Sequence, residues 1–460
     1  MKTALYFSLI FLISINLFAF EKRNLQTTDS VADKYVLPNG AGKKDGSSWE
    51  NALCASQNGL QKVIDELQSD STIWIGSGTY SNISLNLKTG GENGSYKKII
   101  GKDLGSGLPL FINNFDKNNP SKTGQTFLNI QKRVSNFWIQ DIQLKNYQIG
   151  IKSDGGQHQN LRINNVDAEN CRECISLDGG ATVDDTQIGS HDIEIKDCDF
   201  LNYTKRGIRL KNGNYSVRII NSTADAGGKE WATEPFQMGF QVAGVENKTE
   251  GSNFAPDHDI TFINCTSRNN YNDAGDKYWN ADGFVAEKGT YNLKFIDCKA
   301  FDNTDGGWDD KSIGTNYEGC ISLRNKRNYR IWGEVKMLRS IGAYSIFPGG
   351  SGDEAGLWTE GKVVAESCTF HNNGVGIKIA KTGSVTIINS IISLTKDRKG
   401  VLSEFEKSAE LKNIDSILWK ENEIGENPKF INDFANWNGE GKDFDSQTFG
   451  KRKGFYSKSN

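Results

Sequence analysis

Polar side chains that could do chemistry gather in NTDGGWDDKS, residues 303–312, which holds three aspartates, a lysine and two glycines. A related segment, NADGF at residues 280–284, lies 23 residues earlier, and NKRNYRIW follows at residues 325–332. Carboxylates beside cations at a regular spacing could hold a metal ion or an anionic sugar, or could transfer a proton. The alternative is a structural turn, in which Asp bonds its own backbone and Gly takes a positive φ. The choice depends on whether the surrounding elements bring the three segments together.

Short strands with an apolar–polar alternation recur through the middle of the chain, and most of them end in Cys or Ser. Strands of this kind at steps of about 22 to 30 residues indicate a solenoid in which each coil stacks on the next. Longer steps indicate an inserted loop or a missed unit. The repeats are LRINNV (161–166), IEIKDC (193–198), VRIINS (217–222), ITFINC (260–265), LKFIDC (293–298), VKMLRS (335–340), VVAESC (363–368) and VTIINS (385–390).

We therefore predict an all-β fold, a right-handed parallel β-helix that forms one domain over residues 35–440. The recurrent Cys and Ser should stack on one another, which leaves disulfides and buried free thiols both open for the eight cysteines. NGLQKVIDELQ at residues 58–68 predicts a short amphipathic helix that caps the open N-terminal end of the stack. The apolar side of that helix would carry Leu60, Val63, Ile64 and Leu67.

The composition narrows the class of protein. The 460 residues carry a formal net charge of −3, which argues against a nucleic-acid partner. Residues 1–20 start with Lys2 and an apolar run, which predicts a secretory signal peptide, and no later stretch is apolar enough to span a bilayer. We expect a secreted, extracellular monomer with a loose tail at residues 441–460. Sequons such as Asn82-Ile-Ser would make it a glycoprotein if the host glycosylates.

Stacking of coils predicts which polar side chains meet. A residue one coil later lies almost directly above its counterpart, about 4.8 Å away. On this basis Asp282, Asp305 and Arg327 should form one column. The common offset of 23 residues should likewise place Lys311 above Lys288. One face would then carry carboxylates and cations in adjacent rows, which suits an acidic polysaccharide.

Alternation within the strands predicts which of the neighbouring side chains face solvent. Trp308 should point inward and Asp309 outward, and Arg330 should point outward beside Asp309. Trp332 is expected to be a core or ladder aromatic, whereas Tyr278 and Trp279 are better candidates for stacking on a sugar. Three further cations should face outward, namely Lys152, Arg209 and Lys378.

The predicted arrangement resembles the parallel β-helix of pectate lyases, and two segments carry a closer resemblance. SRNNYNDAGDKYWNADGFVAEKG (267–289) and FIDCKAFDNTDGGWDD (295–310) are similar to motifs of the calcium-dependent pectate lyases of polysaccharide lyase family 9. That family carries Asn-Asn-Tyr-Asp, then Asn-Ala-Asp-Gly-Phe-Ala-Ala-Lys and Asn-x-Asp-Asp-Gly-Trp-Asp. The resemblance implies β-elimination of an acidic, uronate-containing polysaccharide with Ca²⁺.

The same resemblance implies roles for individual residues. Asp282, with Asp273 or Asp276, would bind Ca²⁺, and Lys311 would be the catalytic base. Gly306 stands where the family has a second Asp, and Lys311 follows Trp308 sooner than in the family.

The expected outward face adds roles beside these. Arg327 and Arg330 would hold the substrate carboxylates. Asp305, Asp309, Tyr278 and Trp279 would contact the substrate.

Two other functions stay open at this level. Paired carboxylates could serve a glycoside hydrolase as acid and base, although the Gly-His-Gly of polygalacturonases is absent. A non-catalytic β-helix for glycan binding or adhesion is the other alternative. An outward face without converging cations and carboxylates would favour that binding protein.

Overall fold

The computed structural model describes most of the chain, namely residues 33–244, 253–273, 279–425, 427–428, 446–448 and 451–453. The predicted signal peptide lies outside these residues. No helix in the described part of the chain has the length and apolar character needed to cross a membrane.

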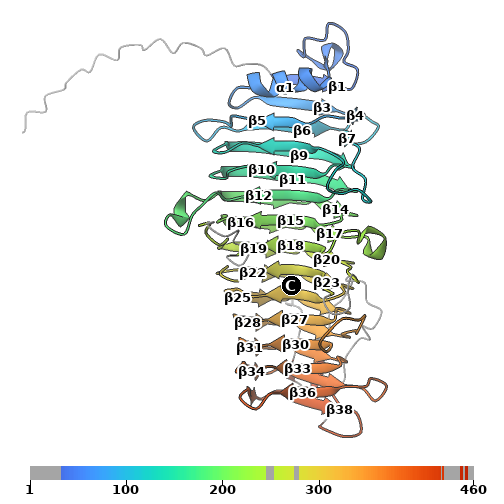
Figure 1. The fold of residues 1–460 in the computed structure, drawn as a ribbon, viewed down its shortest axis with the longest axis vertical. Coiled ribbons are helices and arrows are strands. Elements are labelled where there is room, and N and C mark those ends of the chain that lie inside the picture. Colours follow the sequence, from blue (N-terminus) through green and yellow to red (C-terminus); the bar gives the residue numbers. More distant parts are fainter. Residues whose placement is uncertain are drawn as a thin grey trace, which may run out of the picture. The chain divides into compact units, whose positions relative to one another are not determined.

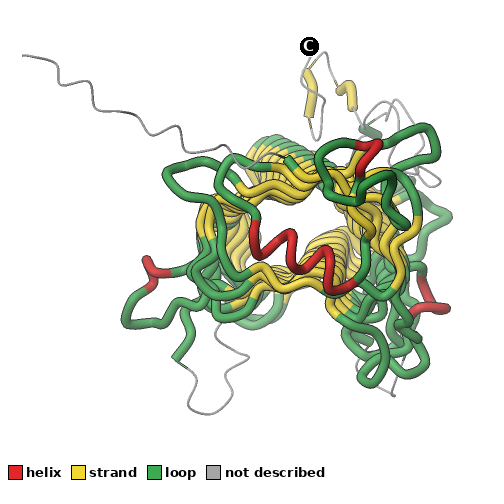
Figure 2. The backbone as a smooth tube through the Cα atoms, turned by 90° about the horizontal axis from the view of Figure 1, so that it is seen from above, coloured by secondary structure: helices red, strands yellow, loops and turns green. Residues whose placement is uncertain are grey.

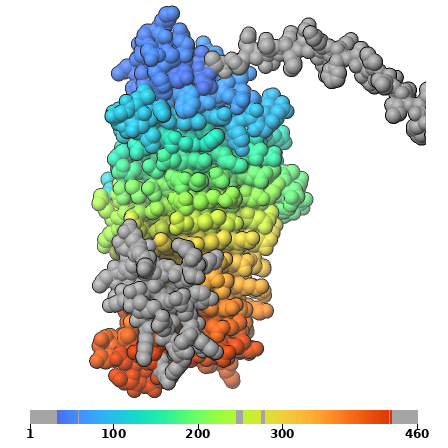
Figure 3. Space-filling model, turned by 180° about the vertical axis from the view of Figure 1, so that it is seen from behind, coloured from blue at the N-terminus to red at the C-terminus, as the bar shows by residue number. Residues whose placement is uncertain are grey.

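The strands form coils that stack in sequence order along the column, as the bands of Figures 1 and 3 show for the unit that begins at Ala32. Most complete coils give one strand to a 12-stranded sheet, sheet B, and two to a 26-stranded sheet, sheet A, whereas Ser135–Lys145 and Gln159–Glu169 are single long strands of sheet A. The ladders within both sheets are parallel, for example Phe284 opposite Trp308 in sheet B and Ile193 opposite Val217 in sheet A. The chain is therefore a parallel β-helix, which confirms the predicted fold class.

Sheet B carries the residues of interest. Its strands are β5 (Leu85–Leu87), β8 (Thr126–Ile130), β10 (Ile149–Ser153), β12 (Glu173–Asp178), β15 (Arg206–Lys211), β18 (Met238–Val242), β21 (Asp282–Ala286), β24 (Gly306–Asp310), β27 (Arg327–Ile331), β30 (Ala355–Thr359), β33 (Val375–Ile379) and β36 (Val401–Phe405).

Sheet A covers the other sides of the coil. Its strands are β1 (Lys34–Leu37), β2 (Leu53–Cys54), β3 (Thr72–Gly76), β4 (Thr79–Ser81), β6 (Lys97–Lys102), β7 (Leu110–Ile112), β9 (Ser135–Lys145), β11 (Gln159–Glu169), β13 (His191–Lys196), β14 (Asp199–Leu201), β16 (Tyr215–Ile220), β17 (Thr223–Asp225), β19 (Ile260–Ile263), β20 (Thr266–Arg268), β22 (Lys294–Ile296), β23 (Lys299–Phe301), β25 (Ile313–Glu318), β26 (Ile321–Leu323), β28 (Glu334–Leu338), β29 (Ile341–Ala343), β31 (Lys362–Glu366), β32 (Thr369–His371), β34 (Ser384–Ile388), β35 (Ile391–Leu394), β37 (Glu410–Ile414) and β38 (Ile417–Lys420).

The remaining elements are short. Helix α1 (Gln57–Glu66) lies across the open end of the ring of strands in Figure 2 and buries Leu60, Ile64 and Leu67 against the core, as predicted. One-turn helices are η1 (Trp49–Asn51), η2 (Thr186–Ile188) and η3 (Gly228–Trp231), and β39 (Ser446–Thr448) pairs antiparallel with β40 (Lys451–Lys453).

The repeat has a physical basis at the corner between two strands of sheet A. The residue just before each Cys or Ser takes a left-handed φ, such as 49° at Asn221, 49° at Asn264 and 53° at Asp297. Asn and Asp tolerate this conformation better than other residues with a side chain. Their side chains also bond between coils, since Asn264 Nδ2 donates to Asn221 Oδ1 at 3.1 Å. These bends explain why a polar residue recurs beside the small buried one.

The interior is lined by ladders of like side chains. Phe240, Phe284, Trp308 and Tyr329 stack in one ladder with ring centroids 4.8 to 5.0 Å apart. The predicted inward Cys and Ser ladder is confirmed, and all eight cysteines are free. A further repeat, β25 followed by Cys320, lies between Cys298 and Ser340. It explains the long step between those two residues.

Candidate functional site

The register between β21, β24 and β27 differs by one residue from the predicted column. Phe284 pairs with Trp308, 24 residues later, and Gly306 pairs with Arg327. Gly306 therefore stands in the rung between Asp282 and Arg327, and Asp305 lies one position earlier. The predicted column with Asp305 in it is wrong because this coil is one residue longer than the offset of 23 assumed.

The same shift changes the neighbour of Lys311. Lys311 Nζ lies 2.6 Å from Oε2 of Glu287, the residue 24 positions earlier. Lys288, the residue that follows Glu287, is exposed. The prediction that Lys311 lies above Lys288 is therefore wrong, and the lysine meets a carboxylate instead.

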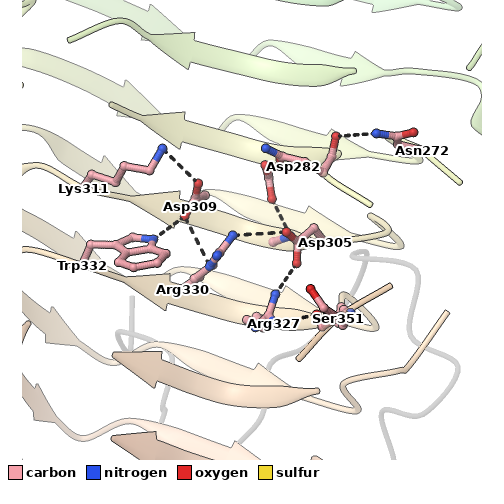
Figure 4. A network of polar contacts seen from close by, with 12 residues as sticks. Asn272, Asp282, Asp305, Asp309, Lys311, Arg327, Arg330, Trp332 and Ser351 are labelled. Carbon is pink, nitrogen blue, oxygen red and sulfur yellow. Dashed lines mark hydrogen bonds and ion pairs between the residues drawn. The ribbon is translucent and has the colours of Figure 1, made fainter. Parts of the chain in front are cut away.

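Asp305 is held by two guanidinium groups (Figure 4). Arg327 Nη1 lies 2.5 Å from Asp305 Oδ1, and Arg330 Nη1 lies 3.2 Å from Oδ2. Arg327 Nη2 also donates to the carbonyl of Ser351 at 3.2 Å, and Lys326 Nζ donates to the same carbonyl at 2.8 Å. The loop before β30 is thereby tied over Arg327, whose side chain is 8% exposed, against 15% for Arg330.

Asp309 is the centre of the outward-facing contacts (Figure 4). Trp332 Nε1 donates to Asp309 Oδ1 at 2.7 Å, and Lys311 Nζ lies 3.5 Å from Oδ2. Arg330 stands opposite Asp309 in the ladder, as predicted, with Nε 3.8 Å from Oδ1. The Lys311 side chain is 24% exposed. Lys311 and Arg330 are thus the cations of this group that a ligand can reach.

Asp310 points the other way. It is 1% exposed, accepts a hydrogen bond from Tyr317 Oη at 2.6 Å and another from the Ser312 backbone at 2.8 Å. Trp308 beside it is fully buried, which confirms its predicted inward orientation. Asp309 and Asp310 therefore do not form a solvated charge pair, because the two carboxylates face opposite sides of the strand.

Burial raises the pKa of two of these carboxyls, Asp282 and Asp305. It raises the pKa of Asp282 well above its ordinary range, and the charges of Asp305 and Asp309 add to the effect. It also raises the pKa of Asp305, against the opposing charges of Arg327 and Arg330. Asp282 Oδ1 accepts a bond from the Gly306 backbone at 2.6 Å, while its buried Oδ2 has no partner in the described residues. Asp282 is accordingly suited to hold a proton.

An aromatic pair borders the charged group on the outer face of sheet B. Trp332 and Trp358 are half-buried, with ring centroids 4.6 Å apart. The Arg330 guanidinium carbon lies 4.7 Å from the Trp332 centroid and 5.7 Å from that of Trp358. Of the expected core and ladder positions, the core position is wrong for Trp332, because this residue follows Ile331 outward at the end of β27. Planar rings beside hydrogen-bonding groups are suited to stacking on a sugar.

Of the residues predicted to bind metal, Asp273 and Asp282 are described, and they lie in different environments. Asp273 is exposed and pairs with Lys229 at 2.8 Å and with Tyr271 Oη at 3.1 Å, whereas Asp282 is fully buried. Asp276 and Tyr278 lie outside the described residues. Within the described ranges no three Asp, Glu, His or Cys side chains form a group that could hold a metal ion. The described carboxylates alone therefore supply no calcium site, and the ligand pair of Asp282 with Asp276 stays a prediction.

Trp279 packs onto a neighbouring loop. A Cβ atom at Gly349 would lie 2.4 Å from the Trp279 ring, and one at Gly350 would lie 3.1 Å away. The half-buried indole thus rests on backbone that only glycine provides. Its predicted contact with a sugar stays a prediction.

Sequence reasoning missed Glu287 and Trp358. Glu287 is 8% exposed and continues the polar contacts toward the N-terminal coils, because Gln241 Nε2 donates to its Oε1 at 3.3 Å. Trp358 faces Arg330 across the ladder although it comes 28 residues later. The outward position of Trp358 within AGLWT follows from alternation. Its partner depends on the length of the loop before β30.

The parallel ladders and the outward group of charges and indoles define a parallel β-helix protein with one candidate site on sheet B. No family model matches the chain, and no curated protein matches it.

Solved structures with a similar fold include pectate lyase Pel9A, 14% identical over 82% of this chain and 79% of that one, with a TM-score of 0.38. A rhamnogalacturonan lyase is 15% identical over 83% and 87%, with a TM-score of 0.44. A GH87 alpha-1,3-glucanase from Streptomyces thermodiastaticus is 14% identical over 86% and 70%, with a TM-score of 0.47. Likenesses of this size carry no argument about activity.

Proposed function

We propose that the chain is a secreted polysaccharide lyase that cleaves an acidic, uronate-containing polysaccharide by β-elimination at the outer face of sheet B. One observation carries the proposal: Lys311, Arg330 and Asp309 converge on a face that Trp332 and Trp358 border. A cation for the uronate carboxylate, a base and a stacking surface are the groups that this chemistry needs.

In this mechanism a uronate ring stacks on one of the two indoles, whose planes are 60° apart, with its carboxylate at Arg330. Neutralising that carboxylate acidifies the adjacent proton, which Lys311 Nζ removes. The electron pair forms the C4–C5 double bond, the C4–O4 bond breaks, and the leaving oxygen takes a proton from solvent. Lys311 must first be a neutral amine, and its proton goes to solvent, because the carboxylate of Glu287, 2.6 Å from Nζ, is a far weaker base than an amine.

The buried residues have supporting roles in this proposal. Arg327 is covered by the Ser351 loop and bonds Asp305, so we assign it to positioning Asp305 and Arg330 rather than to holding the substrate. No step is routed through Ca²⁺, because the described carboxylates do not form a site for it.

A non-catalytic glycan-binding protein is the second candidate. Asp305 and Asp309 are already paired with cations when no ligand is bound. Carboxylates that are engaged in this way favour a surface that binds a glycan and does not react with it. The raised pKa of buried Asp282 keeps a hydrolase in the comparison, since an acid and a carboxylate are its requirements.

One experiment separates the three functions. Mature protein is incubated with polygalacturonate and with alginate, and ultraviolet absorbance of unsaturated uronate is followed together with new reducing ends. A lyase gives both signals, a hydrolase gives reducing ends alone, and a binding protein is retarded in glycan-containing gels without either. The absence of unsaturated product from a panel of uronans would refute the proposed reaction.

A further inference from the structure

Arg209 lies on the outer face of sheet B, in the same row as Asp309 and Arg330. Residues of this row pair in register from β10 to β30, in the order Lys152, Ser176, Arg209, Gln241, Val285, Asp309, Arg330 and Trp358. Arg209 is half-buried. It comes three coils before Asp309, which is about 14 Å along the stack at the usual strand spacing. The predicted outward orientation of Arg209 is thus confirmed.

Arg209 differs from the other cations of the row in its partners. Within the described residues its guanidinium has no hydrogen bond and no ion pair, and its Nε is buried without an acceptor. Lys152 by contrast pairs with Asp154 at 2.7 Å, and Lys378, which continues the row opposite Trp358, pairs with Glu404 at 3.0 Å. A half-buried cation without a counterion is costly, and an anionic group that enters from solvent would relieve that cost.

The surroundings of Arg209 are positively charged. Arg206 precedes it on β15, is 7% exposed, and bonds Gln241 Oε1 through Nε at 2.7 Å. Burial lowers the pKa of Arg206 to about 10; Glu173 opposes this effect, and the nearby charge of Arg209 adds to it. Glu173 itself pairs with Arg172 at 3.2 Å. The local carboxylates are therefore shared among other cations.

We infer that Arg209 forms a second anion subsite, which binds a carboxylate of an acidic glycan chain whose reacting residue lies at Arg330. The inference rests on the proposed function, because it extends the same glycan along the outer face of sheet B. The glycan then runs parallel to the column axis past Gln241 and Val285, which lie between the two guanidinium groups in the row and are buried, so they do not contact it. Gln241 offers no charge and Val285 no polar group, so Arg209 supplies the charge recognition at this end.

The test compares Arg209→Gln and Arg209→Lys with Arg218→Gln. Arg218 lies on β16 of the same coil but on sheet A, with a side chain 58% exposed and Nη1 3.7 Å from Glu194 Oε2. Retardation is measured in gels that contain polygalacturonate, alginate or a neutral glucan, at low and high salt. Unsaturated product is assayed in parallel with long chains and with short oligosaccharides.

We expect Arg209→Gln to weaken binding of the acidic chains by about tenfold, as loss of one charge-assisted contact predicts, with Arg209→Lys intermediate. Oligosaccharides too short to reach from Arg330 to Arg209 should lose nothing, and Arg218→Gln should match the wild type. Unchanged binding of long acidic chains by Arg209→Gln, or equal retardation by the neutral glucan, would overturn the subsite. Arg209-dependent binding without product would keep the subsite and refute the lyase activity.

Discussion

Arg330 stands opposite Asp309 in the ladder between β24 and β27, and its guanidinium reaches past Asp309 to Asp305. Nε lies 3.8 Å from Asp309 Oδ1, and Nη1 lies 3.2 Å from Asp305 Oδ2. One cation therefore serves two carboxylates from the same coil. Its planar group also rests against Trp332 and Trp358, which fixes its position at the edge of the candidate site.

Removal of Arg330 should affect both binding and stability. We expect Arg330→Ala to raise the KM for an acidic polysaccharide at least tenfold and to lower the free energy of unfolding by about 1–3 kcal/mol. Arg330→Lys should recover part of the stability but little of the binding, because lysine lacks the planar fork. Urea unfolding and initial rates measure the two effects. As a control, Arg324→Ala removes a more exposed ion pair with Asp302 and should lower the free energy of unfolding by less than about 1 kcal/mol. Equal losses of stability in the two variants would contradict a special role for Arg330.

The base assignment can be tested against the register. Lys311→Ala should lower kcat by about 10²- to 10⁴-fold with a smaller change in KM. Lys288→Ala should retain the wild-type rate, since Lys288 is exposed and Glu287 is the residue that contacts Lys311. Rates from unsaturated product distinguish the two. A fully active Lys311→Ala enzyme would remove Lys311 as the base and leave the reaction class untouched.

Chelation tests the calcium prediction. Because the described carboxylates form no metal group, we expect EDTA to leave the cleavage rate and the melting temperature unchanged. The measurement is the initial rate and the thermal midpoint with EDTA and after added Ca²⁺. A loss that Ca²⁺ restores would support the sequence-based prediction and would assign a ligand role to residues such as Asp276, outside the described residues.

Asp257 should make stability depend on pH. Burial raises its pKa from 3.8 to about 7, although Asn214 and Ala243 donate bonds to it. The folded state then holds a proton that the unfolded chain releases, so the free energy of unfolding falls as pH rises from about 4 to about 7, by up to about 4 kcal/mol. Urea midpoints across this range measure how the free energy of unfolding depends on pH. The Asp257→Asn variant should lack the part of this dependence that Asp257 contributes. Buried Asp310, with its raised pKa, contributes in the same direction and would leave a residual slope. An unchanged slope in the variant would contradict the assignment.

The cysteines should react as free thiols. Cys54 is exposed and the other seven cysteines are buried, so a thiol reagent should modify one group in the native protein and eight after unfolding. Titration without reductant checks this. Fewer than eight reactive thiols in the unfolded protein would reveal disulfides in the exported chain.

The fold was predictable because its determinants are local. Alternation decides that Trp308 is buried and that Asp309 faces outward, and a left-handed bend at Asn264 or Asp297 suits the residue before each small buried one. Each signal acts within a few residues and repeats in every coil. The capping helix α1 followed from the apolar spacing of Leu60, Ile64 and Leu67 for the same reason.

The contacts of the site needed the register between coils, which no local signal sets. Alternation within the strands predicted that Arg330 faces outward and that it lies beside Asp309. Both predictions are confirmed by the pairing of the two residues in the ladder. The lengths of the turns then decided the partners of the other residues. One residue in the turn before β24 moved Asp305 off the column and brought Glu287 to Lys311, and the loop before β30 brought Trp358 to Arg330.

By itself, therefore, the sequence determined that the chain winds into a parallel β-helix and that one face of it gathers Asp309, Lys311 and Arg330. Strand alternation and corner conformation are properties of neighbouring residues, so they can be read along the chain. Tertiary structure alone decided which carboxylate meets which cation and that Arg209 is left without a counterion in the described residues. Those contacts form only when successive coils close and stack, because a shift of one residue in a turn changes every partner across the ladder.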